Sequence, residues 1–111
     1  MNRALVYLYS ILEDINLAEQ FEADLNKDIE DIKSLKALER VLETLSDATS
    51  KIPLEWKEQY PKIEWNRIKS FRNYIAHDYL SVDTHIILQI MQRNIPELKS
   101  VIEDMLNKYG N

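Results

Sequence analysis

Residues that form turns are scarce in this chain, which has one glycine and three prolines in 111 residues. A fold of many short strands needs frequent turns, and turns use glycine and proline more than most other residues. We therefore expect long helices and a fold of the all-α class. A chain of this length can bury one hydrophobic core, so we expect a single domain over residues 1–111.

Apolar residues recur at helical spacing along most of the chain. Side chains three and four positions apart lie on one face of a helix, and the first segment with this spacing contains Leu5, Leu8, Leu12 and Ile15. The pattern predicts three helices over about residues 2–22, 28–50 and 64–78. Together with the C-terminal segment they form a four- to five-helix up-and-down bundle. Its expected core includes Leu8, Leu12, Leu38, Leu42, Leu45, Ile68, Ile75 and Ile102.

Polar residues and prolines predict the ends of these helices. Asn26 or Asp28 can cap the second helix by accepting hydrogen bonds from free backbone amides. Residues 53–61 begin and end with proline and carry two aromatics between charged residues, which is typical of an irregular connection pinned down by its aromatic side chains. Asp83 is a good cap for a fourth helix, and Pro96 must kink that helix or restart it.

Composition excludes several classes of protein. The chain has no cysteine, which rules out disulfide frameworks and thiol nucleophiles. Its N-terminal apolar run is too short for a signal peptide or a membrane span, so we expect a soluble, cytoplasmic protein without membrane contact. The acidic run from Glu13 to Asp31 lacks the ligand spacing and central glycine of a calcium loop. We expect it to be a solvated face, or a surface offered to a basic partner, and we expect no metal site.

The charge is unevenly distributed. A formal net charge of −5 argues against a general nucleic-acid coat protein, because sequence-independent phosphate binding needs a basic field. In the stretch from Lys62 to His77, however, the cations Lys62, Arg67, Lys69 and Arg72 are opposed only by Glu64. The chain therefore has an acidic first part and a basic middle.

The segment from Phe71 to Tyr79 concentrates groups that can carry chemistry. It holds a permanent cation, an amide, an imidazole that titrates near neutral pH and a phenol: Arg72, Asn73, His77 and Tyr79. These groups suit metal-free RNA cleavage, in which the 2′-hydroxyl attacks its own phosphate while histidine moves a proton and arginine stabilises the developing charge. From the residues alone a plainer interpretation stays open, since an arginine and a histidine on one amphipathic helix usually form surface ion pairs or finish a helix end.

Three other features have competing interpretations. His77 and Asp78 together suggest a metal-dependent HD phosphohydrolase, but that class needs a further histidine upstream, and no histidine precedes His77. His85 lies just inside the fourth predicted helix, where a solvated or capping role is expected. Tyr74 can stack on an RNA base, or it can pack in the core or in a dimer interface, as aromatics at helical spacing often do.

The order of the motif residues resembles the RN-x(3)-H-x-Y motif of the HepT-like branch of the HEPN superfamily, with Arg72, Asn73, His77 and Tyr79 at its fixed positions. The flanks agree over residues 60–65, 81–83 and 94–98. The resemblance covers roughly residues 38–106. One stretch departs from it: where the family commonly has Ile-Gly-Glu-Ala, this chain has Leu-Ser-Asp-Ala at residues 45–48. We expect Ser46 still to allow close helix or subunit contact, and Asp47 to serve as a shorter acid in the pocket wall.

The resemblance implies an endoribonuclease toxin of a type VII-like toxin–antitoxin system. It works as a homodimer, with the motifs of two subunits lining one cleft, and it needs no cofactor. Arg72 and His77 are then the catalytic residues, and Asn73 and Asp78 support them. Arg67, Lys69 and Tyr74 are expected to bind RNA.

The resemblance also implies a mode of neutralisation. A cognate minimal nucleotidyltransferase antitoxin transfers AMP from ATP to the motif tyrosine, which is Tyr79 here.

Two alternatives to the ribonuclease function remain. The first is a catalytically silent helical subunit that binds substrate or docks on a nucleotidyltransferase through the same region, and the second is a purely structural helical adaptor.

Overall fold

The chain folds into helices only, over the part that the structure describes. The computed structural model describes the backbone of residues 2–77 and 83–110, and the side chains of all of these except residues 76 and 77. The helices are α1 (Arg3–Lys27), α2 (Ile32–Thr49), α3 (Leu54–Lys57), α4 (Trp65–His77), α5 (Thr84–Arg93) and α6 (Ile95–Tyr109). None of the described residues forms a strand. The predicted all-α class is confirmed.

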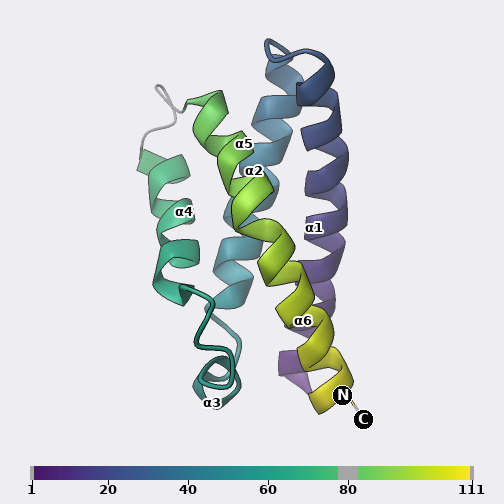
Figure 1. Ribbon diagram of the computed structural model, residues 1–111, viewed down its shortest axis with the longest axis vertical. Helices are drawn as coiled ribbons and strands as arrows, with labels where there is room; N and C mark the ends of the chain where they lie inside the picture. The colour runs from purple at the N-terminus through teal and green to yellow at the C-terminus, as the bar shows by residue number, and fades with distance from the viewer. Residues whose placement is uncertain (1, 78–82, 111) are drawn as a thin grey trace.

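The helices run alternately along the long axis of the molecule, as Figure 1 shows. Helix α1 runs toward one end and α2 returns beside it. After the single-turn α3, α4 runs the same way as α1, and α5 and α6 return in series. The five long helices therefore form the predicted up-and-down bundle, with α2 packed between α1 and α4.

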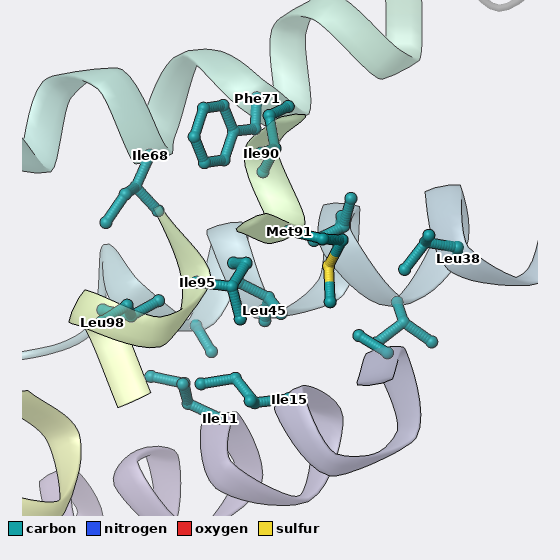
Figure 2. Packing of buried hydrophobic residues seen from close by; sticks show 14 of the residues in the cluster. Ile11, Ile15, Leu38, Leu45, Ile68, Phe71, Ile90, Met91, Ile95 and Leu98 are labelled. Carbon is teal, nitrogen blue, oxygen red and sulfur yellow. The ribbon is translucent and has the colours of Figure 1, made fainter. Parts of the chain in front are cut away.

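Side chains from five helices meet in the core. Figure 2 shows them converging: Ile11 and Ile15 from α1, Leu38 and Leu45 from α2, Ile68 and Phe71 from α4, Ile90 and Met91 from α5, and Ile95 and Leu98 from α6. The predicted core is confirmed at Leu8, Leu38, Leu42, Leu45, Ile68, Ile75 and Ile102, all of which are buried.

One predicted core residue was placed wrongly. Leu12 is only partly buried, whereas Ile11 is fully buried. The buried residues of α1 are Leu8, Ile11, Ile15, Ala18 and Leu25, which shows that the helix is rotated slightly from the predicted orientation. Leu12 lies at the margin of this face, and it still packs against the core.

The start of α2 also differs from the prediction. Asp31 caps this helix, rather than Asn26 or Asp28, because its carboxylate accepts hydrogen bonds from both the backbone N–H (3.1 Å) and the hydroxyl (2.7 Å) of Ser34. Helix α1, which was predicted to end near residue 22, continues to Lys27, and Asp28 is its C-cap. It extends through the acidic run because Ala18 and Leu25 keep one face of the helix buried while the acids stay on other faces.

The connection from Pro53 to Pro61 contains one helical turn, α3, where we expected an irregular segment. Its aromatics pin it down as predicted, and the structure shows that they do so against α6. The Trp56 ring stacks on that of Tyr109 with centroids 4.1 Å apart, and Tyr60 donates a 2.6 Å hydrogen bond to Asp104. The structure confirms the predicted start of α5, and it shows a new helix starting next to Pro96 rather than a kink. Asp83 caps α5 by accepting from the N–H of His85 (2.8 Å), and Pro96 lies in the first turn of α6. No helix in the described ranges is both long and apolar enough to cross a membrane.

Candidate functional site

Helix α4 carries the described part of the motif, Arg72 to His77, and its buried residues set which way the helix faces. Ile68, Phe71 and Ile75 are three and four positions apart and all lie in the core. This arrangement leaves two flanks of α4 accessible. One flank borders α2 and the other borders α5. Arg72 lies on the first flank, and Tyr74 lies on the second.

Arg72 forms an ion pair with Asp47 of α2. The distance from the Arg72 Nε to the Asp47 Oδ1 is 2.7 Å, and the two side chains are 45% and 58% exposed. Among the described residues, no other charged group pairs with this guanidinium. The carboxylate therefore orients the guanidinium from one side, while the terminal nitrogens remain able to bind an anion from solvent.

The position of Asp47 follows from its neighbours on α2. Ser46 is 1% exposed, and its hydroxyl donates a 2.7 Å hydrogen bond to the carbonyl of Leu42, one turn earlier. Leu45 is also buried, so Leu45 and Ser46 face the interior and Asp47 lies at the surface beside α4. The sequence placed Asp47 in the pocket wall, but it did not show that Asp47 pairs with Arg72.

The other motif residues are described in part. Asn73 is exposed on α4, and His77 is the last described residue of that helix. The predicted end of this helix, near His77 and Asp78 or one turn later, falls at the edge of the described residues and stays a prediction. The His77 side chain, Asp78 and Tyr79 lie outside the part that the structure describes, so the catalytic role of His77, the supporting role of Asp78 and the modification of Tyr79 stay predictions.

The three residues expected to bind RNA fall on two flanks of α4. Arg67 and Tyr74 line a pocket of about 400 Å³ between α4 and α5, which also includes Arg93. Lys69 lines a different pocket beside the end of α2. The fold therefore does not gather these three residues around one pocket.

Arg67 and Tyr74 also have structural partners. Arg67 pairs with Glu64, one turn earlier, at 3.5 Å. The Tyr74 hydroxyl accepts a 3.0 Å hydrogen bond from the backbone N–H of Asp83, which joins α4 to the start of α5. The Tyr74 side chain is half-buried, and its hydroxyl has a structural role. Base stacking by its ring remains a prediction.

His85 and the acidic run from Glu13 to Asp31 were expected to be solvated rather than catalytic. The His85 side chain is exposed, as expected for a solvated residue in the first turn of α5. Most acids of the Glu13–Asp31 run are also exposed, although Asp14, Glu22 and Asp31 are partly buried. Burial, followed by the charge of Glu13, raises the pKa of Asp14. No group of three or more potential metal ligands occurs among the residues that were described.

Comparison with known proteins places the chain near one family. Residues 2–105 match the family described as "Ribonuclease HepT-like". The chain is 31% identical over 101 residues to a protein of Thermococcus cleftensis named "Probable ribonuclease HepT", with 89% of this chain and 92% of the relative covered. It is 30% identical over 104 residues to a "Putative RNase" of Caldanaerobacter subterraneus, covering 92% of this chain and 93% of the relative.

A third relative is considerably longer. This protein of Methanocaldococcus jannaschii is named "Gamma-glutamylcyclotransferase and putative RNase" and is 31% identical over 101 residues. The match covers 87% of this chain but 45% of the relative, so the chain spans less than half of that protein. No solved structure matches the chain.

Proposed function

Because this chain belongs to the HepT-like ribonuclease family, we propose that it is a metal-independent endoribonuclease that acts as a toxin. The observation that best supports the proposal is the ion pair between Arg72 and Asp47. It holds the Nε of a half-exposed guanidinium on α4, five positions before His77, and a guanidinium has further N–H donors that can bind a phosphate. We assign catalysis to Arg72 and His77, with Asn73 and Asp78 in support.

The proposed reaction is an internal transesterification. The ribose 2′-oxygen forms a bond to the adjacent phosphorus, the bond from phosphorus to the 5′-oxygen breaks, and a 2′,3′-cyclic phosphate and a 5′-hydroxyl result. The imidazole of His77 moves a proton between these oxygens. The guanidinium of Arg72 stabilises the negative charge that grows on the phosphate oxygens. The cleft is proposed to form between two copies of the chain, so that each subunit contributes its motif.

A dimer cleft also accounts for RNA binding by an acidic protein. The net charge is −5, but the local field at a cleft matters more than the total charge. Lys69 is exposed one turn before Arg72 on the same helix. A two-fold axis beside α4 would bring two sets of these cations together, which raises the local positive potential.

We further propose that a cognate minimal nucleotidyltransferase neutralises the toxin by modifying Tyr79. The phenolic oxygen attacks the α-phosphorus of ATP, a bond from oxygen to phosphorus forms, pyrophosphate leaves, and the phenol proton passes to solvent. Tyr79 follows His77 by two residues. A nucleotide attached there brings a phosphate near the cation and the imidazole that would otherwise act on RNA.

Expression of the full chain in wild-type and substituted forms tests the proposed ribonuclease. Arg72→Ala and His77→Ala are each expected to abolish RNA cleavage while helicity and dimer sedimentation stay unchanged. Arg3→Ala is the matched control, because Arg3 is an exposed arginine in the first turn of α1. Cleavage at wild-type rates by either motif variant contradicts the assigned roles. Absence of RNA cleavage by the wild-type chain favours the silent docking subunit instead.

A further inference from the structure

A small polar pocket lies where the end of α2, the α3 turn and the start of α4 meet. Its volume is about 190 Å³, and it is lined by Thr49, Ser50, Lys57, Trp65, Asn66 and Lys69. Figure 1 shows these three elements together at one end of α4. A water molecule occupies about 30 Å³ of liquid, so the pocket has room for a phosphate group.

Lys57 is held in this pocket by its neighbours. Its ammonium donates a 3.3 Å hydrogen bond to the carbonyl of Thr49 and lies 5.8 Å from the ring centroid of Trp65. The indole N–H of Trp65 in turn donates a 3.2 Å hydrogen bond to the carbonyl of Lys57. The ammonium is therefore positioned before any ligand arrives, which lowers the entropic cost of binding.

The pocket has positive charge without a local counter-ion. Lys69 is the second cation of its lining. Burial, followed by the positive charge of Lys69, lowers the pKa of Lys57, because a nearby like charge disfavours the charged form. Over residues 2–77 and 83–110, no carboxylate oxygen lies within 4.0 Å of either ammonium. An anion in the pocket would relieve this repulsion.

The pocket is adjacent to the site proposed for catalysis. Lys69 and Arg72 are three positions apart on α4, so their side chains are neighbours on one flank of the helix, with a rise between them of roughly 4.5 Å. If a polyanion places one phosphate at Arg72, its next phosphate can reach Lys57 and Lys69. Single-stranded RNA has this repeating charge along its backbone.

We propose that Lys57 and Lys69 form a second phosphate subsite, which binds the RNA phosphodiester next to the one that is cleaved. The inference rests on the ribonuclease function proposed above. The chemistry of the subsite is charge and hydrogen bonding to backbone oxygens, with Asn66 as a further donor at the rim. It contacts no base edge, so it strengthens binding equally for different sequences.

Binding of a non-cleavable RNA measures the subsite apart from catalysis. The probe is a short single-stranded RNA of mixed sequence with 2′-O-methyl groups, followed by fluorescence anisotropy at several salt concentrations. Substitution of both lysines, Lys57→Met and Lys69→Met, keeps their apolar stems and removes both charges. The logarithm of the association constant falls linearly with the logarithm of the salt concentration. Loss of one phosphate contact is expected to make this fall less steep by about 0.7, and to weaken binding at low salt.

Two further variants make the measurement decisive. Lys69→Met alone leaves the hydrogen bond from Lys57 to Thr49 in place, so a weaker RNA affinity in this variant cannot come from that lost contact. Lys33→Met is the matched control, because Lys33 is exposed near the start of α2, at the opposite end of that helix. Its salt slope is expected to equal that of the wild type.

The outcomes separate this inference from the ribonuclease proposal. A salt slope and an affinity that stay at wild-type values in the double variant overturn the subsite, while cleavage that depends on Arg72 and His77 leaves the ribonuclease standing. Weakened RNA binding in the lysine variants, combined with normal cleavage by Arg72→Ala, would have the opposite meaning: the subsite stands and the catalytic assignment fails. A wild-type chain that binds no RNA overturns the subsite.

Discussion

The Nε of Arg72 on α4 lies 2.7 Å from the Oδ1 of Asp47 on α2, so the two helices that border the candidate site are joined by the residue assigned to its chemistry. Arg72 is thus anchored to a neighbouring helix at one edge of its guanidinium. The catalytic contribution of Arg72 should then depend on Asp47, although Asp47 itself is not expected to touch the substrate.

Substitution of Asp47 tests this dependence. Asp47→Asn is expected to lower kcat about tenfold, which corresponds to about 1.4 kcal/mol of transition-state stabilisation, and to change KM little. Asp47→Glu should restore part of kcat, because it keeps the charge. The free energy of unfolding should change by less than about 1 kcal/mol, since the pair is largely exposed. An unchanged kcat in Asp47→Asn would show that the ion pair has no positioning role.

Arg72→Lys tests whether the reaction needs only a positive charge at this position or also the planar geometry of the guanidinium. Lysine keeps the charge but cannot bind Asp47 at one edge and a phosphate at the other through a planar group. We expect kcat to fall by about 10²–10³ for this variant, as for the loss of an oriented donor to a developing oxyanion. Steady-state cleavage of a fluorescent RNA measures the effect. Activity close to that of the wild type would mean that only the net positive charge matters.

The chemistry of the substrate gives a third prediction. An RNA with a 2′-deoxy or 2′-O-methyl sugar at every position should bind but remain intact, because the attacking nucleophile is missing. Cleavage of the natural RNA should proceed at the same rate with EDTA present, since the proposed steps use only the 2′-hydroxyl, His77 and Arg72. Cleavage of the modified RNA, or its arrest by EDTA, would argue for an external nucleophile or a metal ion.

Modification of Tyr79 has a direct mass signature. When the chain is incubated with the cognate nucleotidyltransferase, ATP and magnesium, the wild type is expected to gain the mass of one or more AMP units and to lose ribonuclease activity. Tyr79→Phe should gain nothing, because it lacks the acceptor oxygen. Modification mapped to another residue, with a demonstrably active partner enzyme, would contradict the assignment and leave the ribonuclease proposal intact.

Tyr60 predicts a change of stability in alkaline solution. Burial and the hydrogen bond to Asp104 raise the pKa of Tyr60 from 10.0 to about 12. Because the pKa is higher in the folded state, the contribution of Tyr60 is fully present below pH 10 and is lost as the pH rises toward about 12. The free energy of unfolding should fall more steeply in this range for the wild type than for Tyr60→Phe. Parallel denaturation profiles for the two proteins would show that the contact with Asp104 does not form in solution.

Features that depend on near neighbours in the chain could be predicted from the sequence. Scarce turn residues and apolar spacing predicted the helical class, and Asp83 predicted the start of α5. Pro96 predicted either a kink or a new helix, and the structure shows the new helix, α6. A cap or a helix break is determined within a few residues, so no tertiary information is needed. Even here neighbours compete, and the start of α2 was predicted wrongly because Asp31, rather than Asn26 or Asp28, bonds twice to Ser34.

The rotation of each helix and the contacts between helices were decided only by the tertiary structure. Core packing turns α1 so that Ile11 is buried in preference to Leu12. The same kind of packing on α4, through Ile68 and Ile75, directs Arg72 toward Asp47. The sequence by itself determined which chemical groups the motif contains. The partner of its arginine is decided by the burial of apolar faces from several helices at once, which no local pattern specifies.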